Sequence, residues 1–157
     1  MLLRPAIEAD LPALVRLNSS TQELHAQHVA THFKMPSADP GCAELLRKTL
    51  ADPKACVVVA EEGQAVVGYF FAQEVAREES WIRPALRHFV LEHIAVDFAW
   101  RRKGIGQTLI ERFFEESKSR GIGQVGLYCW RFNENANRFF GRNGLTELYV
   151  RMERNLS

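Results

Sequence analysis

The hydrophobic positions of the first third of the chain repeat mainly with a helical period. Residues 2–7 read as a short strand, and Asp10 is then expected to cap a helix. Helical spacing follows at four apolar positions, Leu11, Leu14, Val15 and Leu17, and we expect the helical segment to run to about Phe33. Residues 34–41 break this pattern, and residues 42–52 predict a second, short helix.

The rest of the chain alternates between strand and helix patterns. Residues 56–76 predict a hairpin around Glu62-Gly63-Gln64, because two β-branched and aromatic runs flank that turn. Residues 88–97 predict a strand, 104–120 a helix closed by Gly121, 124–130 a strand, 134–143 a short helix ended by Gly144, and 145–154 a last strand. We therefore expect one α/β domain over residues 1–157, with a mixed, mostly antiparallel sheet covered by helices.

Composition narrows the classes of function. Hydrophobic residues make up 46% and charged residues 25% of the 157 positions, which is typical of a globular chain. The formal net charge of +1 argues against a nucleic-acid binder that works by bulk charge. Cys42, Cys56 and Cys129 follow no metal-ligand spacing, and their odd number does not suggest a disulfide framework. Because the N-terminus turns charged at once and apolar runs are strand-sized, we expect a soluble, cytoplasmic protein that does not enter a membrane.

A basic, glycine-containing turn precedes the helix expected at 104–120. Arg101, Arg102 and Lys103 stand directly before Gly104 and Gly106. Free N–H groups at a helix start bind anions, glycine permits a close approach, and the cations add charge-assisted contacts, so the turn suits a phosphate. The dinucleotide pattern GxGxxG and the P-loop pattern are both absent. A glycine-relieved helix start with solvated charges remains the alternative.

Two motifs here resemble those of the GNAT superfamily of N-acetyltransferases. The stretch "VDFAWRRKGIGQTLIERF" is similar to its motif A, a strand followed by [QR]-x-x-G-x-[GA] and a helix, with Arg101, Gly104 and Gly106 in place. The stretch "NENANRFFGRNGL" resembles a second signature, N-x-x-A-x-x-F-Y-x-x-x-G-F, with Asn133, Ala136, Phe139 and Gly144 in register. The order of elements along the chain also fits this family.

The resemblance implies a GNAT fold whose central strands splay apart to admit acetyl-CoA. It places the pyrophosphate on the turn at residues 101–107, namely Arg101, Arg102, Lys103, Gly104, Ile105, Gly106 and Gln107. The pantetheine arm would pair with the backbone of Ile94, Ala95 and Val96, while Asn133, Ala136 and Phe140 would line the other side. Relatives are often dimers, so a homodimer is an expectation as well.

Glu92 is the expected general base, because the family often has a glutamate close to the thioester. The surrounding stretch "LEHIAVDFAWRRKGIG" particularly resembles spermidine/spermine N-acetyltransferases. The alternative is a strand glutamate paired with an arginine. His93 is a second candidate base, although alternation should aim it at the opposite face unless a β-bulge shifts the parity. A backbone N–H near residues 94–96 would stabilise the thioester oxygen.

The family's usual general acid is a tyrosine, and Phe140 stands at that position here. The proton must then come from Tyr128 or water, or the thiolate leaves unassisted. The expected function is acetyl transfer from acetyl-CoA to a primary amine, either a small, polyamine-like amine or a peptide amine, by direct attack in a ternary complex. A non-catalytic acyl-CoA-binding module or partner subunit is the alternative.

Three histidines, His25, His28 and His32, share one face of the first expected helix. Their i, i+3 and i+7 spacing is compatible with metal binding, but no carboxylate or cysteine completes an obvious site. Because the chemistry inferred needs no metal, none is expected. Two interpretations of the three histidines remain: they form a partly exposed face of the helix, or they contact the acceptor substrate.

Overall fold

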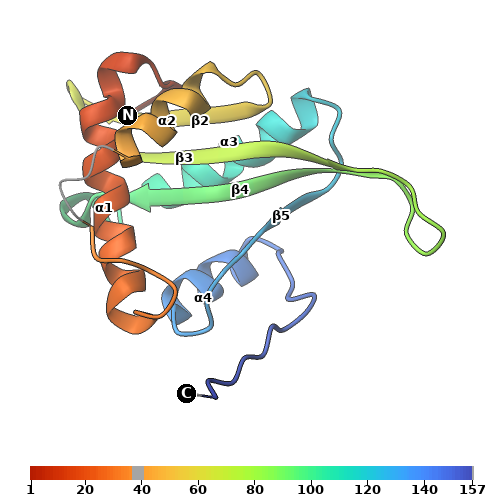
Figure 1. Cartoon of the computed structure of the whole chain (residues 1–157). Helices are drawn as coiled ribbons and strands as arrows, with labels where there is room; N and C mark the ends of the chain where they lie inside the picture. The colour runs from red at the N-terminus through yellow and green to blue at the C-terminus, as the bar shows by residue number, and fades with distance from the viewer. Residues whose placement is uncertain (37–40, 157) are drawn as a thin grey trace.

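A five-stranded sheet forms the centre of the computed structural model, which describes residues 1–36 and 41–156 (Figure 1). Its strands lie in the order β1 (Leu2–Pro5), β2 (Ala55–Glu62), β3 (Ala65–Arg77), β4 (Leu86–Val96) and β5 (Val125–Leu127). Neighbouring strands from β1 to β4 are antiparallel, and β5 is parallel to β4. The structure thus confirms the mixed, mostly antiparallel sheet expected from the sequence.

Helices cover both faces of this sheet. Helix α1 (Leu11–His28) follows a 3₁₀ turn, η1 (Glu8–Asp10), and lies with α2 (Gly41–Ala51) on one face. A second 3₁₀ turn, η2 (Phe98–Trp100), leads into α3 (Ile105–Ser119) on the other face. Helix α4 (Glu134–Arg142) follows β5 and lies away from the sheet, beside the lower half of α1 in Figure 1.

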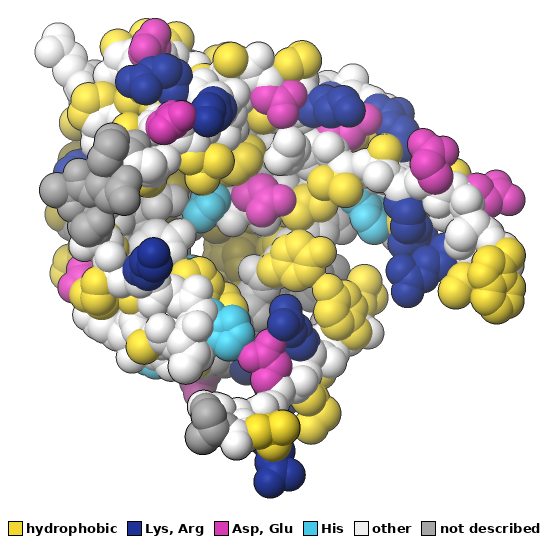
Figure 2. All heavy atoms as spheres, in the orientation of Figure 1, with side chains coloured by type: hydrophobic (Ala, Val, Ile, Leu, Met, Phe, Trp, Pro, Cys, Tyr) yellow, Lys and Arg dark blue, Asp and Glu magenta, His cyan; other side chains and the backbone are white. Residues whose placement is uncertain are grey.

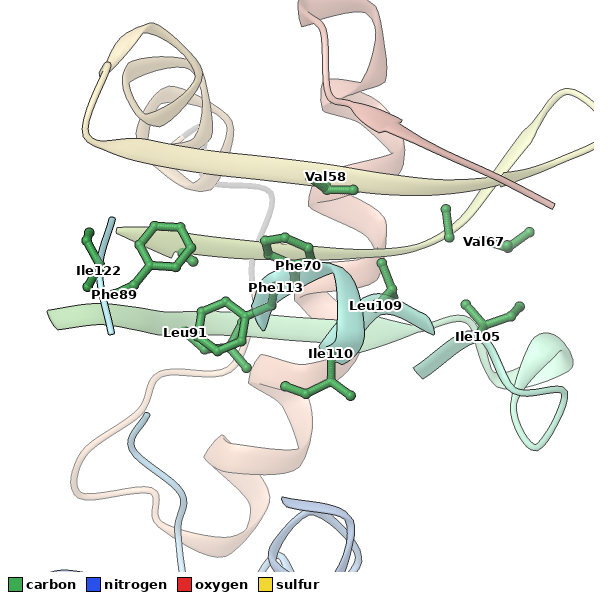
Figure 3. Close-up of a cluster of buried hydrophobic side chains, with 12 residues drawn as sticks. Val58, Val67, Phe70, Phe89, Leu91, Ile105, Leu109, Ile110, Phe113 and Ile122 are labelled. Atoms are coloured by element: carbon green, nitrogen blue, oxygen red, sulfur yellow. The ribbon is translucent and has the colours of Figure 1, made fainter. Parts of the chain in front are cut away.

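The larger of two hydrophobic cores lies between the sheet and α3 (Figure 3). Helical spacing brings Ile105, Leu109, Ile110 and Phe113 onto the face of α3 that the sheet buries. The Phe113 ring stacks on Phe89 at 5.3 Å between centroids and meets Phe70 edge-on at 6.0 Å. This core fixes the start of α3, and with it the basic turn, against the sheet.

The second core lies under α1 and α2. Leu11, Leu14 and Leu17 of α1 pack with Leu46 of α2 against the sheet residues Val57, Val59, Tyr69 and Phe71. Asn18 is buried among them, and its amide donates to the Tyr69 hydroxyl at 3.1 Å. The sheet is therefore covered on the α1 side as far as Ala95 of β4.

Two expectations about the first helix were wrong, and part of a third cannot be compared with the structure. Helix α1 ends at His28, not near Phe33. The Asp10 side chain does not cap α1, because it accepts two hydrogen bonds from Arg4, at 2.7 and 2.9 Å, and one from the Ile7 N–H. Residues 37–40 of the expected connection lie outside the described residues.

The strand expected at residues 145–154 is also wrong. The backbone N–H of Leu145 still bonds to the Phe140 carbonyl, but residues 146–154 join no strand among the described residues. A strand needs a paired edge, and β5 stays beside β4 only for Val125–Leu127, shorter than the expected 124–130. The segment therefore has strand-like alternation without a ladder.

Candidate functional site

The central feature of the site is a gap that opens where β5 leaves β4. The two strands pair at only three positions, Phe89 with Val125, Val90 with Gly126 and Leu91 with Leu127. Beyond them the chain after β5 runs away toward α4, as Figure 1 shows. Glu92 and Tyr128 are thus the first residues past the last pair on the two strands. Figure 2 shows a hollow between the sheet and the part of the chain that carries α4.

A β-bulge sits at this point of β4. Phe71 of β3 pairs with His93 and Ala72 pairs with Leu91, so Glu92 is the extra residue. The bulge shifts the parity of the strand, because Leu91 and Ile94 both pack with the α3 core whereas Ala95 packs with the α1 core. Glu92 therefore has no partner residue on β3, and it lies at the mouth of the gap.

The Glu92 carboxylate has no ion pair or hydrogen-bond partner within residues 1–36 and 41–156. Its side chain is exposed to solvent on one side, yet the protein on the other side desolvates it and raises the pKa of the carboxyl above its ordinary value. The alternative of a strand glutamate paired with an arginine does not apply within these residues. A carboxylate with a raised pKa and no partner is suited to accept a proton.

His93 points away from the gap, toward α1. Its ring lies over Phe71 with centroids 6.0 Å apart, and Nδ1 lies 3.2 Å from the Asn18 amide. Burial, with a smaller contribution from His25, lowers the pKa of His93. The bulge thus separates the two candidate bases, and His93 lies among packing partners.

Two of the three expected cofactor-arm residues direct backbone N–H groups at the gap. The Asp97 N–H bonds to the Val67 carbonyl of β3. Because backbone groups alternate in direction along a strand, the N–H groups of Val96 and Ile94 point away from β3. The Val96 carbonyl accepts instead from the Arg101 guanidinium at 3.1 Å. The backbone N–H and carbonyl of Ala95 point toward β3, where Ala95 pairs with Tyr69. Donors at Ile94 and Val96 are thus available to a molecule in the gap.

The basic turn follows η2 and presents a run of backbone donors. The N–H groups of residues 102–107 have no acceptor among the described residues, and the first intrahelical bond runs from Thr108 to Gly104. Gly104 has φ 85°, a left-handed conformation that suits glycine, and Arg102 adopts a similar φ of 61°. For a residue with a Cβ this costs about 1–2 kcal/mol, so the surrounding fold holds the turn in a strained shape.

The three cationic side chains of the turn, Arg101, Arg102 and Lys103, differ in their contacts. The Arg101 guanidinium lies over the Phe98 ring and holds the Val96 carbonyl, and the Lys103 ammonium lies 4.4 Å from the centroid of the Trp100 ring. Of these three, only Arg102 has a side chain without a partner among the described residues. It is therefore the cation of the turn that is most available to a phosphate.

Helix α4 is anchored to the start of α3. Gln107 donates to the Asn143 side chain at 2.8 Å, and a Cβ placed on Gly106 would meet the Phe139 ring at 3.8 Å. Asn133 caps α4 by accepting from the Ala136 N–H at 3.2 Å, and it also lines a shallow pocket of about 290 Å³ with His28, Phe132 and Arg138. The structure thus gives Asn133 and Ala136 a structural role in this cap.

Phe140 packs against the α3 core and meets the Phe139 ring edge-on at 5.4 Å. It offers no proton at the position of the family's usual tyrosine. Tyr128 lies instead at the mouth of the gap, within electrostatic range of Glu92, and its phenol lies beside that of Tyr149. The neighbouring Tyr149 phenol, and to a smaller degree burial, raise the pKa of Tyr128. Tyr149 was missed in the sequence, since nothing in its segment relates it to Tyr128.

The three N-terminal histidines join an aromatic cluster. His28 stacks on Phe132 with centroids 4.4 Å apart, His25 stacks on Phe33, and His32 meets Trp130 edge-on. Because α1 ends at His28, His32 leaves the helical face and pairs with Glu153 at 2.9 Å. No group of three or more metal-ligating side chains occurs in the described part of the chain. The cluster ties the end of α1 to the loop that precedes α4.

Comparison with known proteins agrees with this architecture. The model of the acetyltransferase (GNAT) family matches residues 21–145. No curated protein matches the sequence. Within residues 1–36 and 41–156, no helix combines the length and apolarity that a membrane crossing needs.

Solved structures of low sequence identity share the fold. A tetramutant of the BH1408 protein from Bacillus halodurans has a TM-score of 0.91 at 22% identity, over 99% of this chain and 100% of that one. A predicted acetyltransferase from Clostridium acetobutylicum, solved with acetyl-CoA, has a TM-score of 0.73 at 17% identity, over 99% and 96%. An aminoglycoside acetyltransferase, meta-AAC0020, from an uncultured soil metagenomic sample reaches 0.67 at 22% identity, over 99% and 96%. Because the family model spans most of the sequence, the chain belongs to the acetyltransferase (GNAT) family.

Proposed function

We propose that the protein is an acetyl-CoA-dependent N-acetyltransferase whose acceptor is a primary amine. The observation that carries this proposal is the run of unpartnered N–H groups at residues 102–107, directly beside a gap with Glu92 at its mouth. The family uses acetyl-CoA, and the Clostridium acetobutylicum neighbour was solved with it. The residues present fit such a ligand, since donors of the turn suit its pyrophosphate and donors of β4 suit its extended arm.

Acetyl-CoA would supply an activated acyl thioester, and the protein would supply the proton transfers and the oxygen stabilisation. An alkyl amine with a pKa of about 10.4 must lose a proton before it attacks, which costs roughly 4.6 kcal/mol at pH 7. Glu92 accepts the amine proton directly or through one water, and its raised pKa makes it a stronger base than an ordinary glutamate. The N–H groups of Ile94 and Val96 donate to the carbonyl oxygen as negative charge develops.

Tyr128 is the proposed proton donor for the departing thiolate. The nitrogen–carbon bond forms, the carbon–sulfur bond breaks, and the sulfur takes the phenolic proton. Water then returns a proton from Glu92 to the phenol, so that both groups recover. The Tyr128 phenol is protonated at neutral pH, because its ordinary pKa is near 10 and the neighbouring Tyr149 raises it further. Phe140 cannot take this role.

The acceptor is proposed to be a small or polyamine-like amine, or a peptide amine. Its positive charge would be attracted to the Glu92 carboxylate at the rim of the gap. The resemblance of residues 91–106 to spermidine/spermine N-acetyltransferases supports the polyamine class. A peptide amine would reach the same rim from solvent, because Glu92 and Tyr128 are both exposed.

The test measures release of free CoA from acetyl-CoA with a panel of amines, comparing wild type with Glu92→Gln across pH. We expect turnover with one amine class and a loss of about 10²–10⁴-fold in kcat for Glu92→Gln. Glu115→Gln on the exposed side of α3 is the matched control and should keep wild-type turnover. Equal rates in Glu92→Gln and wild type would refute the assignment of the base.

The second candidate function is a non-catalytic acyl-CoA-binding module or partner subunit, which Phe140 at the usual position of the acid favours. It differs from the first in one measurable respect. Such a module would bind CoA without acetylating any amine in the panel, and Glu92→Gln would leave its CoA affinity unchanged.

A further inference from the structure

The buried face of α1 carries a polar side chain, Asn18, beside its leucines. Asn18 follows Leu11 and Leu14 at the i, i+3 and i+7 spacing of that face, and it is only 6% exposed. Burying an amide lowers stability unless its polar groups are hydrogen-bonded, and a leucine would pack at this position without that requirement. The partners of Asn18 therefore indicate its role.

Asn18 joins the two strands that form the β-bulge. Its amide nitrogen donates to the Tyr69 hydroxyl of β3 at 3.1 Å and lies 3.2 Å from Nδ1 of His93 on β4. Its oxygen accepts from the Cys42 thiol of α2 at 3.6 Å, so the nitrogen faces the strands. The amide nitrogen and the carbonyl oxygen thus have partners on three different elements.

His93 is the residue of β4 that resumes pairing with β3 after the bulge. It pairs with Phe71, on which its ring stacks with centroids 6.0 Å apart, whereas the residue before it, Glu92, has no partner on β3. The extra residue of a bulge can move to a neighbouring position unless side chains fix the register. Because one peptide bond joins His93 to Glu92, a ring that Asn18 and Phe71 hold also fixes where Glu92 lies.

The contact with Asn18 determines which nitrogen of the His93 ring carries the proton. An amide nitrogen can only donate, so Nδ1 is the acceptor and the proton of the neutral ring lies on Nε2. An imidazolium would lose this bond, since both of its nitrogens carry protons. Burial, and to a smaller degree the nearby His25, lower the pKa of His93 and so also favour the neutral ring. With its Nδ1 lone pair occupied, His93 does not compete with Glu92 for a proton at this atom.

We propose that Asn18 is a positioning residue for acetyl transfer, which holds the neutral His93 ring toward α1 and so keeps the β-bulge at Glu92. This role presupposes the proposed function, in which Glu92 accepts the amine proton. Asn18 acts on Glu92 only through His93 and the bulge. It thereby selects which of two neighbouring candidate bases stands at the gap.

Steady-state kinetics of variants test this role. Asn18→Leu removes the donor to Nδ1, and His93→Phe keeps a ring beside Phe71 but removes the acceptor. Both should lower kcat about ten- to a hundredfold at an unchanged KM for acetyl-CoA, because a displacement of about 1 Å at the base has an effect of that size. The double variant should lose no more than the worse single variant, since the same contact is removed each time. Tyr69→Phe is the matched control, because it removes the other hydrogen bond of the same amide and should keep wild-type kcat.

NMR measurements test the same contact without turnover. In wild type, the nitrogen shifts of the His93 ring should place its proton on Nε2. The pKa of the Glu92 carboxyl, followed by its carbon shift, should lie above the ordinary value in wild type. It should fall toward that value in Asn18→Leu and His93→Phe, because water reaches a side chain that the bulge no longer holds, and stay unchanged in Tyr69→Phe.

The two sets of measurements separate the positioning role from the proposed function. If wild type acetylates no amine, the proposed function fails, and the NMR measurements still decide whether Asn18 fixes the bulge. A His93 proton on Nδ1 would overturn the role of Asn18. So would a wild-type kcat and Glu92 pKa in Asn18→Leu, or equal losses in Tyr69→Phe. Should Asn18→Leu not fold, His93→Phe and the wild-type tautomer provide the same decision.

Discussion

Gly104 provides a sharp test of the turn, because the structure separates its conformational role from packing. A Cβ added at Gly104 would meet nothing within 4 Å, so the whole cost of Gly104→Ala to stability comes from its φ of 85°. That cost is about 1–2 kcal/mol for a residue with a Cβ. For a chain of this size it corresponds to a fall in Tm of roughly 2–8 °C.

Gly63, in the β2–β3 turn, offers a matched control. Its φ is 65°, and a Cβ there would also meet nothing within 4 Å. Gly63→Ala and Gly104→Ala should therefore lower the free energy of unfolding by similar amounts in urea titrations. Only Gly104→Ala should weaken CoA binding, because it alone shifts the N–H groups of the turn.

The expected loss of CoA affinity in Gly104→Ala is about tenfold or more, measured by calorimetry below the unfolding transition. A single charge-assisted hydrogen bond contributes about 1.5–3 kcal/mol, and about 1.4 kcal/mol already changes a dissociation constant tenfold. The reasoning is refuted if Gly104→Ala binds CoA as tightly as Gly63→Ala. It is also refuted if both variants lose affinity equally, since the effect would then follow stability alone.

Three further predictions follow from other contacts. Gly68→Ala places a Cβ 3.0 Å from the Ala95 carbonyl oxygen and should cost about 1–3 kcal/mol of stability in urea unfolding; an unchanged midpoint would contradict this. Tyr128→Phe should lower kcat about tenfold or more at constant CoA affinity, whereas wild-type kcat would assign the proton transfer to water. Burial holds the pKa of His93 below its ordinary 6.5, so the unfolded chain binds more protons and stability should fall as pH drops through 6.5. His93→Asn should flatten that slope in unfolding titrations at pH 7.5, 6.5 and 5.5, and an unaltered slope would exclude His93 as its source.

Patterns that depend on neighbouring residues along the chain could be predicted from the sequence. The α3 helix follows from the spacing of its apolar residues, and the β2–β3 hairpin follows from two β-branched runs around Gly63. The basic turn was also evident, because residues 101–106 contain all the charges and glycines that form it. These elements hold the candidate cofactor site, which explains why that part of the site could be located.

Features that depend on pairing between distant segments could not be predicted. The bulge at Glu92 arises from the register between β3 and β4, and no residue type marks it. The apolar residues Leu148, Val150 and Met152 alternate as in a strand and led to the wrong prediction at residues 145–154, because the sequence does not reveal that β5 offers the segment no edge. Likewise the sequence did not show that α1 ends at His28, or that the His28 ring stacks there on Phe132 from the other end of the chain.

Acetyl transfer to an amine at the gap beside Glu92 can be tested directly. Its most direct test incubates the protein with trideuteroacetyl-CoA and the best amine of the panel, and identifies by mass spectrometry where the label goes. We expect one trideuteroacetyl group in amide linkage on the amine, formed by wild type and nearly absent with Glu92→Gln. Binding of CoA with the label left on the thioester, or recovered only as free acetate, would contradict it.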